Sequence, residues 1–345
     1  MVSFGLMFRP GHFPLSHMLA CLKVAEDVGF EQAWFGDSHL IWHEVGPYLT
    51  AAAMSTTRMR VGPLVSNPIT RHPTVVASML ATLGELFDGR AALGIGRGDS
   101  AVRTLGLPPM KLAEFREAVR LMRRLCRGEA AEVHGTPIRL SWLSRRVPLL
   151  LAAYGPRVLE LAGAEADGLI LQLASPSVVE WAVGHTRRGA ATSGRSLDGF
   201  EIIAAAPTYI SEDRERALSR VRGFPATVSN HVKDLLRRYR PEELPADLVD
   251  GMDRVTEYDY LRHGVPDAPH TRAVTDQMAE RLTLIGTAGQ VREKIARLEA
   301  AGVTHVCLYL GIVEPELHVS TLETYGRDII PHFRRAAAAP PPGRP

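Results

Sequence analysis

Strand-like and helix-like segments alternate along almost all of the 345 residues, and this alternation constrains the fold more than any other feature. Eight segments are short and largely apolar, and most of them are followed by a stretch with helical spacing. The expected strands cover residues 2–8, 32–36, 59–65, 90–96, 147–153, 167–173, 200–210 and 304–310. Strands that are apolar throughout are typical of a parallel sheet covered on both faces. Eight such units favour an α/β fold of the (β/α)8 TIM barrel type over an open doubly wound sheet.

One long segment interrupts this rhythm before the last strand. Between residues 211 and 276 the sequence is charged and mostly helical, which predicts a helical insertion. Two interpretations of the insertion remain open, namely a solvated excursion and a lid over the barrel mouth. We expect one (β/α)8 barrel domain over 1–335, which includes this insertion, and a disordered tail of low complexity over 336–345.

Composition excludes several classes of function. A net charge of +2, with 46% hydrophobic and 23% charged residues, is typical of a soluble globular protein and lacks the basic excess of a nucleic-acid-binding protein. No apolar run is long enough to span a bilayer, and the N-terminus lacks the basic start of a signal peptide. We therefore expect a cytoplasmic protein that binds a small-molecule substrate, with no nucleic acid and no membrane as partner.

The cysteines and histidines give no metal-binding pattern. Three cysteines, at positions 21, 126 and 307, are odd in number and widely separated, which predicts neither a disulfide framework nor a thiol metal cluster. His39 and His43 are four residues apart, but the H-E-x-x-H pattern is absent and a glycine and a proline follow closely. We therefore expect no metal site.

Polar residues gather where the expected strands end. The carboxyl ends of all strands in a barrel meet at one face, where ligands bind. We expect one cavity there, lined by Asp37, Ser38, His39, Asn67, Asp99, Gly155 and Gln172. A histidine beside a ligand suits proton transfer because imidazole titrates near neutral pH. A loop histidine that only bonds to the backbone is the alternative interpretation of His39.

The stretch "GIGRGDS", residues 94–100, places three alternating glycines at the end of the fourth expected strand. Their spacing differs from the G-x-G-x-x-G of dinucleotide-binding folds, which excludes a Rossmann site. Backbone amides of Gly94–Gly98 can approach an extended ligand, and amides at the helix that opens near Pro156 can bind an anion. Glycines also occur in βα loops for steric reasons alone, and this interpretation stays open.

Three stretches together carry a resemblance to a known family. "VGPLVSNPITRHPTVVAS", "RAALGIGRGDS" and "LAAYGPRVLELAGAEADGLIL" resemble the bacterial luciferase-like superfamily, and the similarity spans nearly the whole chain. The branch it resembles most is that of oxidoreductases using the deazaflavin coenzyme F420, close to methylenetetrahydromethanopterin reductase. The resemblance implies a (β/α)8 barrel with an insertion before the last strand, often a homodimer, and hydride transfer between F420 and a small organic substrate. An FMN-dependent monooxygenase and a non-catalytic flavin-binding barrel are the alternatives.

The resemblance also implies roles for single residues. Asp37 would contact the deazaflavin ring. Our own candidates for the proton-handling group are Asp99 and His39, so these three are the catalytic candidates. Together with the strand-end pattern, the resemblance gives a cofactor-binding set of Asp37, Leu64, Val65, Asn67, Gly96, Gly98, Asp99, Tyr154, Gly155, Pro156, Arg157 and Gln172.

Strand 3 carries a further implication of the resemblance. Pro63 cannot donate to a sheet ladder, which predicts an irregular strand end. Relatives have a non-prolyl cis peptide bond here, and we expect it at Leu64–Val65. Two residues depart from the family pattern: Ser38, rather than a histidine, follows Asp37, and an aspartate stands at position 99 where some relatives carry glutamate.

Overall fold

The structure is a computed structural model, and it describes residues 1–255, 257–263, 265 and 268–334. The expected tail over 336–345 lies outside the described residues. Eight strands form one barrel: β1 (Ser3–Phe8), β2 (Gln32–Phe35), β3 (Arg60–Pro63), β4 (Leu93–Ile95), β7 (Leu149–Ala152), β8 (Gly168–Leu171), β9 (Glu201–Ile210) and β11 (His305–Tyr309). They pair in parallel in the order β3-β2-β1-β11-β9-β8-β7-β4.

The barrel is nearly closed at the seam between β3 and β4. Isolated parallel bridges join Val61 to Ala91 and Ser66 to Ile95 across this seam. A side chain at Gly62 would collide with the backbone carbonyl of Ala92, so the two strands approach this closely only because residue 62 is glycine. The (β/α)8 barrel predicted from the alternation is confirmed.

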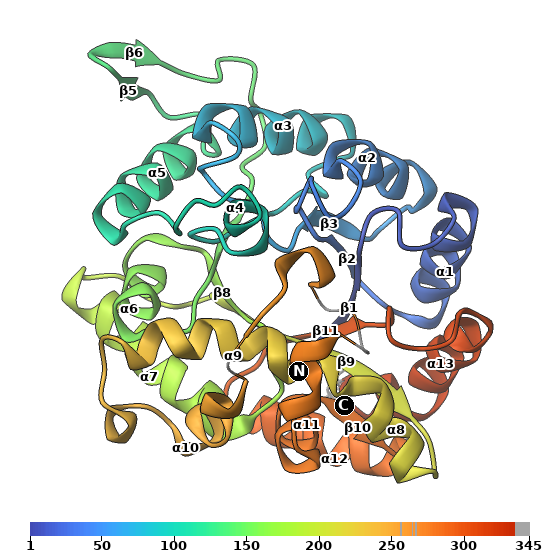
Figure 1. Cartoon of the computed structure of the whole chain (residues 1–345). Coiled ribbons are helices and arrows are strands. Elements are labelled where there is room, and N and C mark those ends of the chain that lie inside the picture. Colours follow the sequence, from blue (N-terminus) through green and yellow to red (C-terminus); the bar gives the residue numbers. More distant parts are fainter. Residues whose placement is uncertain (256, 264, 266–267, 335–345) are drawn as a thin grey trace, which may run out of the picture.

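A ring of helices surrounds the barrel (Figure 1). These helices are α1 (Leu15–Val28), α2 (Val45–Ser55), α3 (Pro73–Leu86), α5 (Leu112–Leu125), α6 (Pro156–Glu165), α7 (Pro176–Thr192), α12 (Ala288–Ala300) and α13 (His318–Thr324). Helix α5 shows why they pack: Phe115, Val119 and Met122 recur at helical spacing and are buried. Arg116, Arg120 and Arg124 on the same helix are exposed. The chain continues after α13 through short π and 3₁₀ turns over Tyr325–Ile329 and Ile330–His332. No helix in the described part of the chain is both long and apolar enough to cross a lipid bilayer.

The helical insertion follows β9. Its helices are α8 (Arg214–Val221), α9 (Gly223–Leu236), α10 (Ala246–Val249) and α11 (Asp276–Leu282), with 3₁₀ turns at Pro241–Glu243, Met252–Arg254, Tyr260–Arg262 and Pro269–Ala273. Helix α11 begins at residue 276, where the insertion is expected to end, and leads into a short strand, β10 (Leu284–Gly286). This strand pairs in parallel with the end of β9 and has too few residues to stand out in the sequence.

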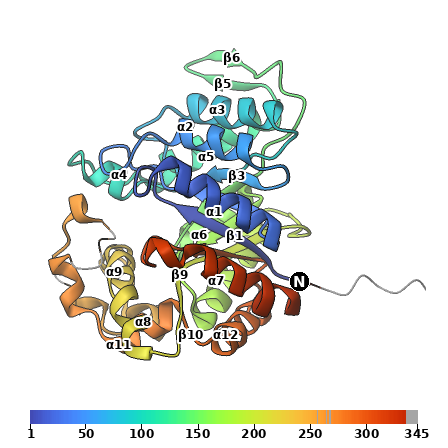
Figure 2. The same ribbon diagram turned by 90° about the vertical axis from the view of Figure 1, so that its right-hand side faces the viewer.

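A β-hairpin outside the barrel was not predicted from the sequence. Strands β5 (Ala131–Val133) and β6 (Thr136–Ile138) pair in antiparallel fashion and project from the helical ring (Figures 1 and 2). His134 and Gly135 join them, with φ angles of +50° and +76°. A residue followed by glycine between two short β-prone runs is a hairpin signal.

The amino-terminal end of the barrel is filled by charged side chains. Arg60 at the start of β3 forms a two-pronged ion pair with Glu201 at the start of β9. His305 Nε2 lies 3.5 Å from the same carboxylate, and burial lowers the pKa of His305 to about 4. The opposite end of the barrel carries the short helix α4 (Ser100–Arg103) and the insertion helix α9, which lie on the same side of the molecule (Figure 2).

Candidate active site

A cavity of about 370 Å³ opens at the carboxyl ends of the barrel strands. The residues at its wall come from the loops after several strands and from the insertion. Most of the residues expected from the sequence line it: Asp37, Ser38, Leu64, Val65, Asn67, Gly96, Gly98, Asp99, Tyr154, Gly155, Arg157 and Gln172. Barrel geometry explains this agreement, because residues that directly follow parallel strands meet at one rim.

Two of the expected residues lie elsewhere. The prediction that His39 faces the cavity is wrong, because its side chain is exposed on the turn after β2 and is not part of the wall. Ser38 lines the cavity, and its hydroxyl lies 2.7 Å from that of Ser100; Trp42, further along the same loop, lines it as well. Pro156 occupies the first turn of α6 outside the cavity wall, whereas its neighbours Gly155 and Arg157 line the cavity.

Asp37 is held in a buried network at the end of β2. Its carboxylate accepts hydrogen bonds from Ser66 Oγ at 2.7 Å and from Arg71 Nε and Nη2 at 3.0 and 3.1 Å. Arg71 also pairs with Glu44, which is half exposed. Because both oxygens of Asp37 are bound by protein groups, this carboxylate fixes the ends of β2 and β3 against each other.

The cis peptide bond predicted at Leu64–Val65 is confirmed. It follows directly on Pro63, the last residue of β3, and both Leu64 and Val65 line the cavity. The next residue, Ser66, is bound on both sides: its amide donates to the Gly94 carbonyl at 3.0 Å, and its carbonyl accepts from the Gly96 amide at 2.9 Å. The bulge is therefore anchored to the end of β4.

The alternating glycines within β4 and just after it are explained by packing. A side chain at Gly94 would collide with the carbonyl of Pro63, and one at Gly96 would meet Val65 Cγ2 at 3.0 Å. Gly98 adopts a φ of +93°, a conformation that favours glycine. The Gly96 amide is already used by Ser66, so the expectation that the whole loop offers its amides to a ligand is wrong at this position.

Asp99 lies beside two basic side chains at the cavity. Its Oδ1 accepts from Arg103 Nε at 3.1 Å, and its Oδ2 lies 3.7 Å from His231 Nε2. His231 comes from insertion helix α9, and its ring stacks on that of Tyr154 with centroids 4.5 Å apart. Burial and the nearby Asp99 raise the pKa of Tyr154, whose hydroxyl donates to the carbonyl of Gln172 at 3.1 Å.

The insertion supplies a large part of the wall. Its contributions are His231, Asp234, Leu235, Arg238, Tyr239 and His263. His263 is buried, its Nδ1 lies 2.8 Å from the Tyr258 hydroxyl, and burial lowers its pKa to about 4. The insertion is thus part of the cavity and not merely a solvated excursion. Sequence reasoning missed these residues because it sought cavity residues only at strand ends; the histidines within a charged helical insertion were the available signal.

The wall combines apolar side chains with basic ones. Leu64, Val65, Ala152 and Ile170 give an apolar surface, and Arg97, Arg157 and Arg238 bring guanidinium groups to the cavity. Arg97 Nε donates to the Met110 carbonyl at 2.6 Å, and burial lowers the pKa of Arg97. Within the described residues, the side chains of Arg157 and Arg238 form no ion pair. This distribution suits a ligand with a flat apolar part and an anionic part.

A (β/α)8 barrel whose cavity is built from the loops after its strands is the arrangement of the barrel enzymes. Comparison with known proteins narrows this class. The chain matches the luciferase-like monooxygenase family over residues 2–305, and it belongs to that family.

Individual relatives match the chain over nearly its full length. It is 30% identical to the 5,10-methylenetetrahydromethanopterin reductase of Archaeoglobus fulgidus, over 96% of this chain and 100% of that one. It is 29% identical to the F420-dependent glucose-6-phosphate dehydrogenase of Beutenbergia cavernae, over 97% and 98% of the two chains. The solved structure of the coenzyme F420-dependent tetrahydromethanopterin reductase of Methanopyrus kandleri superposes with a TM-score of 0.75 at 28% identity, covering 96% of this chain and 99% of that one.

Proposed function

We propose that this chain is an F420-dependent oxidoreductase, which transfers a hydride between coenzyme F420 and a small organic substrate in the strand-end cavity. The observation that carries the proposal is the cavity wall, which combines the apolar side chains of Leu64 and Val65 with three arginines. Relatives of almost equal length whose names include F420 dependence support the same cofactor.

The residues of the cavity fit the chemistry of such a cofactor. A deazaflavin ring is flat and mostly apolar, which suits the surface formed by Leu64, Val65 and Ile170. The phosphate of the cofactor needs cationic donors, and Arg157 and Arg238 have guanidinium groups that no carboxylate occupies in the described part of the chain. We assign these two arginines to the phosphate end.

The protein's own contribution to the reaction is positioning and proton transfer. When bound, the deazaflavin supplies or accepts the hydride. Asp99 is our candidate for holding and moving the proton, because its carboxylate lies at the cavity and is 18% exposed. Arg103 orients this carboxylate, and His231 stands within reach of its other oxygen. Asp37 is assigned to holding the wall, since its oxygens are occupied by Ser66 and Arg71.

Titrations with F420 and with FMN test the cofactor assignment. We expect F420 to bind the purified chain, and the Arg157→Gln and Arg238→Gln variants to bind it about tenfold or more weakly, because each loses a charge-assisted contact. Arg187→Gln is the matched control, since Arg187 lies exposed on α7 away from the cavity. Turnover of reduced or oxidised F420 with candidate alcohols, aldehydes and imines then tests the reaction.

Binding of FMN without binding of F420 would overturn the cofactor assignment and favour an oxygen-activating enzyme. F420 binding that is equal in all three arginine variants would show that the phosphate lies elsewhere. We also propose that the enzyme acts as a homodimer, as its resemblance to the family implies; the mass of the protein in solution, from light scattering, tests this.

A further inference from the structure

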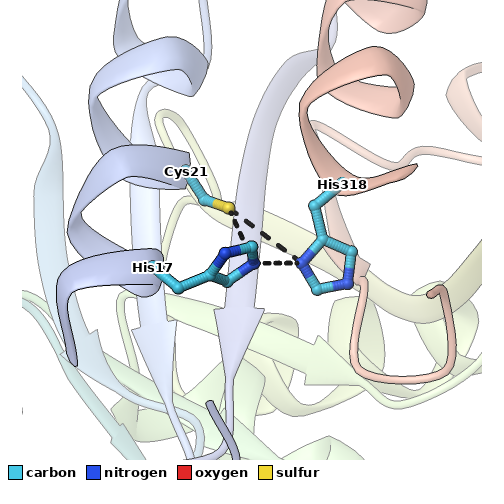
Figure 3. Close-up of side chains that lie close together, drawn as sticks. All are labelled: His17, Cys21 and His318. Carbon is cyan, nitrogen blue, oxygen red and sulfur yellow. Dashed lines mark hydrogen bonds between the residues drawn. The ribbon is translucent and has the colours of Figure 1, made fainter. Parts of the chain in front are cut away.

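A cluster of two histidines and a cysteine lies outside the cavity, between α1 and α13 (Figure 3). His17 and Cys21 are four residues apart in the first turns of α1, so they share one face of that helix. His318 is the first residue of α13 and lies 301 residues after His17 in the chain. The cluster therefore joins the first and the last helix of the barrel ring.

The spacing of the three donor atoms suits a metal ion. His17 Nε2 lies 3.0 Å from His318 Nδ1, and Cys21 Sγ lies 3.6 and 4.0 Å from these two nitrogens. Tetrahedral zinc with Zn–N of about 2.05 Å and Zn–S of about 2.3 Å separates its ligands by roughly 3.3 Å between nitrogens and 3.6 Å between nitrogen and sulfur. The two nitrogens need to separate by a few tenths of an ångström, and Cys21 Sγ needs to approach His318 Nδ1 by a similar distance.

The surroundings of His318 prepare it as a ligand. Its Nε2 lies 3.1 Å from the carbonyl of Val313 and donates to it, so Nδ1 presents its lone pair to the cluster. Metal-binding histidines commonly donate their second ring nitrogen in this way, which fixes the ring and its tautomer. Phe13 packs edge-on against the His318 ring with centroids 4.9 Å apart. Cys21 and His318 are buried and His17 is half-buried, which leaves one side open for an ion to enter.

We propose that His17, Cys21 and His318 bind one Zn²⁺ ion, with water as the fourth ligand. Binding releases the proton of the Cys21 thiol, and the thiolate and the two neutral imidazoles form bonds to the metal without any change of oxidation state. The ion fastens α1 to α13 and so joins the two ends of the barrel ring. The sequence predicted no metal cluster at the cysteines, because the third donor is contributed by a helix at the far end of the chain.

The test uses the full chain after treatment with a chelator. Co²⁺ is added as a spectroscopic probe, since a thiolate ligand gives it a sulfur-to-metal charge-transfer band in the near ultraviolet. We expect one equivalent to bind, Zn²⁺ to displace it, and Zn²⁺ to raise the melting temperature. In Cys21→Ser the charge-transfer band should vanish and the Co²⁺ affinity should fall by more than about tenfold. Replacing a residue that only supports a ligand already lowers metal affinity by about tenfold, so loss of the ligand itself should cost more.

Cys126→Ser is the matched control, because Cys126 is another buried free cysteine and lies far from the cluster, at the end of α5. His17→Gln changes the most exposed of the three donors and should also weaken Co²⁺ binding while the protein stays folded. Failure of the wild-type chain to bind stoichiometric Co²⁺ or Zn²⁺ would overturn the proposal, and the cluster would then be a hydrogen-bonded chain from His17 through His318 to Val313. A charge-transfer band that survives in Cys21→Ser would overturn it as well.

Discussion

Replacing Arg71 by alanine is expected to destabilise the barrel mouth by about 3 kcal/mol. The carboxylate of Asp37 has a side-chain exposure of 1% and, among the residues that the structure describes, would keep only its hydrogen bond from Ser66. Removing one partner of a buried ion pair typically costs about 3–5 kcal/mol, because the remaining charge is left without compensation. Arg71 is itself 19% exposed, so water can partly replace it, and this places the expected value at the lower end of that range.

Urea unfolding followed by circular dichroism measures this loss. The double variant Asp37→Asn with Arg71→Ala should be more stable than Arg71→Ala alone, because the amide removes the buried charge. Arg145→Ala is the control, since its partner Asp88 is 89% exposed and such surface pairs contribute about 0–1 kcal/mol. The reasoning would be refuted if Arg71→Ala lost less than about 1 kcal/mol of unfolding free energy, or if the double variant were no more stable than Arg71→Ala. Either result would mean that the Asp37 carboxylate is not left as an uncompensated buried charge.

Three further changes test other parts of the molecule. Asp99→Asn should lower kcat by about a hundredfold or more while leaving the urea midpoint unchanged, and a wild-type rate would remove Asp99 from the reaction. Lys294→Met should lower the unfolding free energy by about 2–3 kcal/mol, because Nζ of Lys294 donates to the carbonyls of Glu280, Arg281 and Thr283 near the end of α11. An unfolding free energy equal to that of the wild type would contradict this role. The folded pKa of His263, about 4, lies below its unfolded value near 6.5, so its stabilising effect is complete above pH 6.5 and declines as the pH falls towards 4. By pH 5 the wild type should therefore lose on the order of 2 kcal/mol more unfolding free energy than His263→Gln in urea titrations, whereas identical profiles would exclude His263 as the cause.

The fold was predictable because its signals are local. Each barrel strand is a short apolar run, and each expected strand overlaps an observed one; β3, expected over 59–65, ends at Pro63. The irregular end of β3 was foreseen because Pro63 cannot donate to a neighbouring strand, while the cis bond itself came from the family resemblance. The hairpin over 131–138 and strand β10 were missed because their strands are three residues long, too short to show a period.

The site was predictable only where it depends on strand ends. His39 shows the limit of this rule: one residue beyond Ser38 the chain turns, and its side chain faces solvent. His231 and His263 enter the cavity from the insertion, where no strand register fixes which face of a helix points inward. Cys21 and His318 meet only because the first and last helices of a closed ring are neighbours, a contact that no local pattern contains.

The two sources of the cavity wall have different consequences for the proposed reaction. Residues at strand ends are fixed by the barrel: Ser66 is tied to Gly94, Gly96 and Asp37, so the bulge against which the cofactor would lie is determined by the sheet. The insertion is attached to the barrel by side-chain packing and ion pairs, of which Arg103 with Asp234 is one. Substitutions in the insertion can therefore reshape the cavity while the cofactor wall stays in place. Substrate selectivity would then be expected to change with the insertion and cofactor affinity with the strand ends.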